Sequence, residues 1–166
     1  VQLYTALLEA AAAHAGGPVG GRALGALRIE KGYGSWGREY SPEYWPQETG
    51  LHGLIKLDKD FLNKDAYLRI SNTPPRETLT MFEVDVTDDA DANGGEPIFL
   101  ADGTPVGRVT SGAYGYTVGK SLAIGYAREG VVAPGDKVDI YILGKPHMAT
   151  VLAEPPFDAG GARLRT

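Results

Sequence analysis

The sequence predicts an α+β protein, in which a helical or mixed N-terminal part is followed by a small antiparallel β-barrel. In the N-terminal part, apolar residues recur at helical spacing, whereas from Glu77 to Val86 they alternate with polar residues. Beyond that segment, short apolar runs are separated by frequent turn residues, as in small closed or nearly closed barrels. The change of period falls at Asn72-Thr73-Pro74-Pro75, so we place the domain boundary between residues 1–73 and residues 74–166.

The first two helices are predicted from their apolar spacing. Residues 1–14 place apolar side chains on one face, and the Gly-Gly-Pro sequence that follows ends this helix. A second helix, over about residues 22–31, is expected to bury Leu24 and Leu27. It is expected to end at Gly32, because glycine readily adopts the left-handed conformation found at helix C-termini.

The segment 33–50 fits neither period and is predicted to be an ordered, aromatic-rich loop. Its prolines interrupt any helix or strand. The aromatic residues of this loop are Tyr33, Trp36, Tyr40, Tyr44 and Trp45. A third, short helix is expected to begin at Asp58 or Asp60, either of which can cap it, and to run to about Leu68.

The C-terminal part is predicted as a series of short strands. Asp102-Gly103 lies between two apolar segments and is a strong hairpin signal, because this pair tolerates positive φ angles. Pro134-Gly135-Asp136 and Gly144-Lys145-Pro146 predict further turns. The expected strands are residues 77–86, 97–100, 106–110, 122–126, 138–143 and 148–153.

Composition narrows the classes of function. With 43% hydrophobic and 22% charged residues the chain is globular, and its net charge of −5 without a basic stripe argues against nucleic acid as a partner. No apolar run approaches the roughly 20 residues that span a bilayer, so no membrane role is expected. The absence of cysteine excludes disulfides, thiolate zinc sites and a cysteine nucleophile. We expect a cytoplasmic protein and, since Val1 opens directly inside a helical pattern, a fragment of a longer one.

Three segments imitate ligand-binding motifs. Residues 32–37 have the spacing of a dinucleotide fingerprint, but a predicted helix precedes them where a strand is needed. Residues 115–121 are one residue short of a P-loop and lie between strands. Residues 89–94 copy half of an EF-hand loop, yet its twelfth position is Leu100. A solvated acidic loop is therefore preferred, and weak calcium binding stays open as an alternative. The acidic residues concerned are Asp85, Asp88, Asp89 and Asp91.

One cluster suits a ligand on physical grounds. Arg28 and Glu30, on the last turn of the second helix, are placed to pair with the loop backbone and to fix Tyr33 and Trp36. Rigid aromatic side chains beside a fixed Arg–Glu pair suit a flat heteroaromatic ligand. A packed aromatic corner without a ligand is the alternative. No catalytic residue and no metal ligand is assigned.

These residues also carry a family resemblance. The run Leu27-Arg28-Ile29-Glu30-Lys31-Gly32-Tyr33-Gly34-Ser35-Trp36-Gly37-Arg38-Glu39 resembles the segment after the folate-binding helix of glycine-cleavage T-protein (aminomethyltransferase) modules. Its form is closest to the dimethylglycine and sarcosine dehydrogenase branch. The likeness continues through residues 49–51, 56–61, 95–97 and 107–120. It implies the C-terminal portion of a folate-binding domain followed by the family's C-terminal barrel.

The resemblance implies one-carbon transfer to tetrahydrofolate, within an enzyme that oxidises a small methylated amine and binds FAD in a separate N-terminal domain. It implies Tyr33 as a folate contact, with Trp36 and Arg28 shaping the same wall. Two positions depart from the T-proteins: Leu24 stands where they have an arginine, and Gly160-Gly161-Ala162 where they end in tyrosines.

The resemblance also implies what the chain lacks. The family's catalytic aspartate and the glutamate that holds the pterin come from segments before Val1. We therefore expect the chain alone to be inactive, and to pair through an exposed apolar seam with the N-terminal remainder of its own enzyme. The alternatives are an aminomethyltransferase of the glycine cleavage system, a non-catalytic T-protein-like module, or a structural barrel with a calcium loop.

Overall fold

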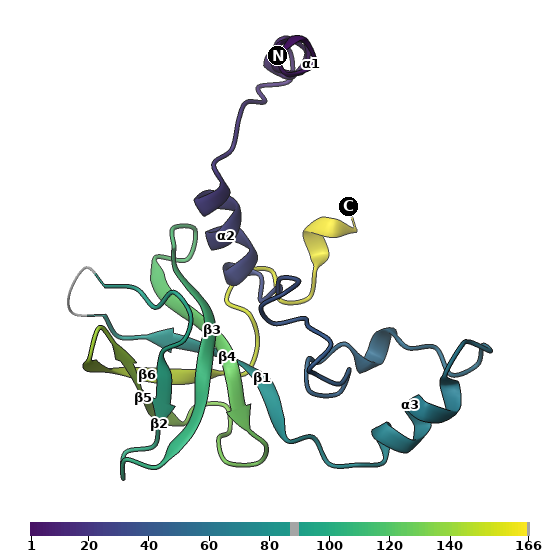
Figure 1. Cartoon of the computed structure of the whole chain (residues 1–166). Coiled ribbons are helices and arrows are strands. Elements are labelled where there is room, and N and C mark those ends of the chain that lie inside the picture. Colours follow the sequence, from purple (N-terminus) through teal and green to yellow (C-terminus); the bar gives the residue numbers. More distant parts are fainter. Residues whose placement is uncertain (87–89, 166) are drawn as a thin grey trace.

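Figure 1 shows the computed structural model of the protein, which describes residues 1–86 and 90–165. Helices lie outside a closed antiparallel barrel, which confirms the predicted α+β class. The elements are α1 (Gln2–Ala12), α2 (Gly21–Glu30), the one-turn helix η1 (His52–Leu54), α3 (Lys64–Ser71), β1 (Glu77–Val84), β2 (Pro97–Phe99), β3 (Pro105–Gly115), β4 (Lys120–Arg128), β5 (Lys137–Ile142), β6 (Lys145–Leu152) and the one-turn helix η2 (Ala162–Leu164). Within the described residues, no helix is long and apolar enough to cross a membrane.

The barrel has the strand order β1-β4-β3-β2-β5-β6, and β6 closes it by pairing with β1. The predicted turns are present. Gly103 has a φ of 83° in the β2–β3 hairpin, and Leu143 and Gly144 have positive φ angles in the β5–β6 turn. The turns therefore separate the strands as predicted, but three strands are longer than predicted. β3 extends to Gly115, and β4 spans Lys120–Arg128 rather than residues 122–126. β6 begins at Lys145, within the predicted Gly144-Lys145-Pro146 turn.

Two apolar clusters hold the fold together. Phe82 and Val84 belong to the barrel interior, as their alternation predicted, and pack there with apolar residues of the other strands. A second cluster lies on the outside, where Ile29 of α2 packs against Leu122 and Ile124 of β4. Successive residues of β4 point to opposite faces, so this strand is buried on both sides. Helix α2 is thus a covering element of the barrel.

The buried face of α2 differs from the predicted one. Leu24 and Leu27 are 61% and 51% exposed, whereas Ala26, Ile29 and Glu30 are buried. The helix has two apolar faces, one with Leu24 and Leu27 and the other with Ala26 and Ile29. The barrel covers the face with Ala26 and Ile29. Helical spacing identifies an apolar face but does not identify which face a distant strand covers.

Helix α3 begins later than predicted, and neither Asp58 nor Asp60 caps it. Asn63 precedes its first residue with a φ of 65°, a left-handed conformation that breaks the helical path. The helix therefore starts at Lys64 and runs to Ser71. In Figure 1, α3 and α1 both stand away from the barrel, and α1 has no buried residue.

Candidate functional site

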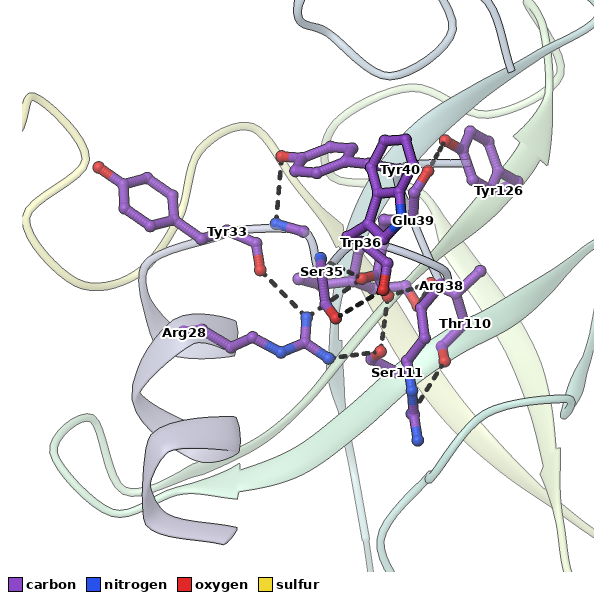
Figure 2. A network of polar contacts seen from close by, with 12 residues as sticks. Arg28, Tyr33, Ser35, Trp36, Arg38, Glu39, Tyr40, Thr110, Ser111 and Tyr126 are labelled. Carbon is purple, nitrogen blue, oxygen red and sulfur yellow. Dashed lines mark hydrogen bonds and ion pairs between the residues drawn. The ribbon is translucent and has the colours of Figure 1, made fainter. Parts of the chain in front are cut away.

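A polar network joins α2, the aromatic loop and the barrel (Figure 2). Arg28 on the last turn of α2 donates from Nη1 to the carbonyl oxygen of Tyr33 (3.0 Å) and to Oε2 of Glu39 (3.2 Å). Its Nη2 donates to Oγ of Ser111 on β3 (2.7 Å). One guanidinium therefore contacts three segments, and the predicted contact of Arg28 with the loop backbone is confirmed.

Glu39 lies at the centre of this network and has no solvent exposure. Besides Arg28, its Oε2 accepts a hydrogen bond from the backbone N–H of Ser35 (2.7 Å). Its Oε1 accepts from the hydroxyls of Thr110 and Ser111, both at 2.6 Å. Burial alone would raise the pKa of Glu39, but these hydrogen bonds and the Arg28 charge together hold that pKa below its ordinary value of 4.5. The carboxylate is ionised and fully bonded at neutral pH.

The loop is packed onto the barrel by aromatic contacts. The rings of Tyr44 and Tyr126 stack with centroids 3.8 Å apart and planes 7° apart. The Tyr126 hydroxyl donates to the carbonyl oxygen of Glu39 (2.7 Å), and burial raises the pKa of Tyr126. The loop is therefore ordered, as predicted, because its aromatic side chains cover the outer face of β4.

A second buried carboxylate fixes the other end of the loop. Oε1 of Glu48 accepts from Nε of Arg76 (2.8 Å) and from its backbone N–H (3.1 Å), while Oε2 accepts from Nη2 of Arg76 and from the Trp45 N–H, both at 2.8 Å. The hydrogen bonds from Arg76 are the main cause that lowers the pKa of Glu48 to about 2. Sequence reasoning missed both Glu39 and Glu48. Their only local signal is a carboxylate within an aromatic loop.

A cavity of about 490 Å³ lies between this loop, β1 and the chain after β6. Its wall includes Tyr33, Tyr40, Leu51, Met81, Glu154 and Pro155. The C-terminal segment is held in place by a hydrogen bond from the Phe157 N–H to the Glu30 carbonyl (3.2 Å) and by the Lys31–Asp158 ion pair (3.2 Å). The cavity is thus a concave, mainly apolar site with a few polar groups, the usual composition of small-molecule sites.

The three predicted site residues do not share one wall. Tyr33 lines the cavity, and its side chain points away from the network in Figure 2. Arg28 contacts the backbone of Tyr33 rather than the cavity. Trp36 is 79% exposed and lies outside the cavity lining. Glu30, expected to pair with the loop, instead accepts from the Thr117 N–H (2.6 Å) and holds the β3–β4 turn.

The acidic segment offers no complete ligand set in the described part of the chain. Within residues 1–86 and 90–165, no group of three or more metal-ligating side chains is placed to hold an ion. Oδ1 of Asp91 accepts a hydrogen bond from the Ser121 hydroxyl (2.6 Å). Asp88 and Asp89 lie outside the described residues, so calcium binding stays a prediction.

The chain resembles known proteins over nearly its whole length. Residues 78–158 match the family described as "Glycine cleavage T-protein C-terminal barrel domain", and residues 1–59 match "GCVT N-terminal domain". The chain is 37% identical over 165 residues to the mitochondrial dimethylglycine dehydrogenase of Mus musculus. It is 34% identical over 154 residues to the 4-methylaminobutanoate oxidase (formaldehyde-forming) of Paenarthrobacter nicotinovorans. An aminomethyltransferase of Herpetosiphon aurantiacus is 33% identical over 159 residues.

The shares of each chain covered differ between these relatives. The matches span 98%, 88% and 95% of this chain, but only 19%, 18% and 42% of the respective relatives. The crystal structure of the glycine cleavage system aminomethyltransferase T from Bartonella henselae superposes with a TM-score of 0.74, at 22% identity, over 82% of this chain and 38% of that one. That likeness supports the fold. The chain belongs to the glycine cleavage T-protein family and lies near its dimethylglycine dehydrogenase branch.

Proposed function

We propose that the chain is the C-terminal part of a tetrahydrofolate-dependent one-carbon transfer module, within an FAD-linked demethylase of the dimethylglycine or sarcosine dehydrogenase type. The proposal rests on the cavity lined by Tyr33. Arg28 holds the backbone of Tyr33 by a hydrogen bond to its carbonyl oxygen. Its volume of about 490 Å³ suits part of a small heteroaromatic ligand, and its apolar wall with a few hydroxyls and one carboxylate suits a ring with polar edges. These residues fit a folate ring.

The cavity residues have distinct roles in this proposal. Tyr33 offers a flat face for stacking, and Leu51 and Met81 exclude water from the ring. Glu154, an exposed carboxylate of the lining, is available to accept hydrogen bonds from ligand N–H groups. Tetrahydrofolate, when bound, supplies the nitrogen atoms that capture the one-carbon unit. Glu39 and Glu48 are saturated by protein donors, so they hold the wall rather than move protons.

The proposed partner is the N-terminal remainder of the same enzyme, which would supply FAD and the groups that act on the methylated amine. Helices α1 and α2 offer apolar surface for it. Leu3 and Leu7 of α1 are 73% and 61% exposed, and Leu24 and Leu27 of α2 are also exposed. Each of the two helices therefore exposes apolar side chains, and exposed apolar surface is a feature of interaction sites.

An aminomethyltransferase of the glycine cleavage system is the second candidate. It is supported by the Herpetosiphon aurantiacus aminomethyltransferase, of which this chain covers 42%, against 19% of the mouse dehydrogenase. The two candidates differ in what precedes the folate-binding module. A glycine-rich FAD fingerprint encoded upstream supports the dehydrogenase type, and its absence supports the transferase.

Excess tetrahydrofolate is expected to raise the melting temperature of the chain. A ligand that binds only the folded state stabilises it by about 2.7 kcal/mol at a hundred times its dissociation constant. Tyr33→Ala is expected to abolish the rise, while Tyr116→Ala, which removes an exposed tyrosine outside the cavity, is expected to retain it. Absence of a shift in the unaltered chain would contradict folate binding by this cavity.

The chain alone is expected to transfer no one-carbon unit from dimethylglycine to tetrahydrofolate. General acid–base catalysis requires a group within hydrogen-bond reach of the proton that moves, and the family's catalytic aspartate is expected to precede Val1. The measurement is formation of methylenetetrahydrofolate from isotopically labelled dimethylglycine, with FAD and an electron acceptor added to take up the two electrons of the oxidation. Turnover above the rate without protein would refute this expectation.

A further inference from the structure

We propose that Glu39 is a positioning residue, which acts through Arg28 to fix the backbone of Tyr33 at the cavity and so sets how well a flat ring binds there. The ligand in this inference rests on the proposed function, whereas the positioning itself rests on the contacts alone. Glu39 does not line the cavity, and no spacing in the sequence marks it as a site residue.

Both ends of the Arg28 guanidinium depend on Glu39. Nη1 lies between the Glu39 carboxylate and the Tyr33 carbonyl, at 3.2 Å and 3.0 Å. Nη2 donates to Ser111, and the hydroxyl of Ser111 in turn donates to Glu39. The Arg28 side chain is 19% exposed and flexible on its own. Without the carboxylate, nothing in this set of contacts balances its charge, and its hold on Tyr33 weakens.

The barrel departs from regular pairing at the place where it binds Glu39. Neighbouring residues of a strand normally point to opposite faces, yet Thr110 and Ser111 both reach Oε1 of Glu39 at 2.6 Å. The β3–β4 register shifts between Val109 and Ser111, which places an extra residue at Thr110. Such bulges re-aim side chains and are frequent beside functional sites. The bulge thus turns two hydroxyls toward one carboxylate.

The choice of a charged group at this position also indicates a positioning role. Replacing a buried ion pair by apolar residues often leaves stability unchanged or improves it, so an anchor for the loop needs no carboxylate. A fully bonded carboxylate adds directionality, because it fixes Arg28 in one orientation. That orientation points Nη1 at the Tyr33 carbonyl.

The test compares Glu39→Gln with Glu43→Gln in the 166-residue chain. Glu43 lies in the same loop with an exposed side chain, so its substitution is the matched control. One readout is the set of Tyr33 ring resonances in tyrosine-labelled protein, assigned with Tyr33→Phe. The other is the dissociation constant for tetrahydrofolate.

Glu39→Gln is expected to shift the Tyr33 resonances, to leave those of Tyr141 on β5 unchanged, and to raise the dissociation constant about tenfold. In a Tyr33→Ala background it is expected to add no further loss. Ser111→Ala removes one donor to Glu39 and is expected to act in the same direction, so it decides the matter if Glu39→Gln does not fold. Glu43→Gln is expected to change neither readout.

Unshifted Tyr33 resonances in a folded Glu39→Gln or Ser111→Ala variant would overturn the inference. So would an affinity loss that adds fully to that of Tyr33→Ala, since Glu39 would then act by another route. If the unaltered chain binds no tetrahydrofolate, the proposed function fails, while the Tyr33 resonances still decide whether Glu39 positions that residue.

Discussion

Glu48→Gln is expected to lower the free energy of unfolding by about 3 kcal/mol at neutral pH. The substitution removes the negative charge beside Arg76, and the glutamine NH2 group, which cannot accept, replaces one of the two oxygens that accept from N–H donors. The Glu48 carboxylate has no solvent exposure and accepts from Arg76 and from the Trp45 N–H. The Arg76 side chain is 57% exposed, and water screens part of the attraction, so the low end of the usual range applies. Urea titration followed by tryptophan fluorescence measures the change.

The stabilisation that Glu48 provides is expected to depend on pH within a defined range. The pKa of Glu48 is lowered from its ordinary 4.5 to about 2, so at intermediate pH the folded state binds fewer protons than the unfolded state. Its contribution is therefore complete above the ordinary value and is lost as the pH falls toward the lowered value. The stability difference between the unaltered chain and Glu48→Gln is expected to narrow over this window. Glu43→Gln should match the unaltered chain throughout, and a difference that persists at about pH 2 would contradict the assignment to this carboxylate.

The strands were predictable from the sequence because their signals are local. Alternation over Glu77–Val84 and the Asp102-Gly103 pair act within a few residues, and a closed barrel allows few arrangements of such short strands. Helix α2 ends at Glu30, and Gly32, two residues later, has the left-handed φ of 70° that the sequence predicted for a glycine at this helix end. In these segments, local preference and the global fold agree.

The network around Glu39 was not predictable, because its partners are remote in the chain. Thr110 and Ser111 lie 71 and 72 residues from Glu39, and Arg76 lies 28 residues from Glu48. No spacing rule connects them, and the bulge that aims the two hydroxyls has no marker in the sequence. For the same reason, the sequence identified Arg28 and Tyr33 as neighbours across a helix end but grouped the exposed Trp36 with them.

The buried face of α2 was missed for a related reason. Its exposed stripe of Leu24 and Leu27 is as apolar as the stripe that packs on the barrel. When a helix has two apolar faces, apolar spacing alone does not show which of them packs on the barrel. If the proposed N-terminal remainder docks on this stripe, both faces of α2 are buried in the whole enzyme.

Gly107→Ala is expected to destabilise the barrel by about 3 kcal/mol, the upper end of the cost of overpacking, because backbone rather than side chain must move. A Cβ atom at Gly107 would lie 2.0 Å from the carbonyl oxygen of Tyr126 and 2.9 Å from Cα of Ala127. Gly107 pairs with Ala127 across β3 and β4, so the substitution forces these strands apart. Thermal unfolding and urea titration both measure the loss.

The strain at Gly107 is expected to reach the loop, since β4 carries Tyr126, whose hydroxyl donates to the Glu39 carbonyl and whose ring stacks on Tyr44. Gly25→Ala is the matched control, because a Cβ there meets no atom within 4 Å and alanine favours a helix interior by about 1 kcal/mol. The same chemical change should thus have opposite signs at the two positions. A loss at Gly107 below about 1 kcal/mol would mean that β3 and β4 can separate without disturbing the barrel. If a destabilised Gly107→Ala variant retained the Tyr44–Tyr126 stack, the strain would be confined to β3 and β4. The barrel would then hold the loop independently of the spacing between these two strands.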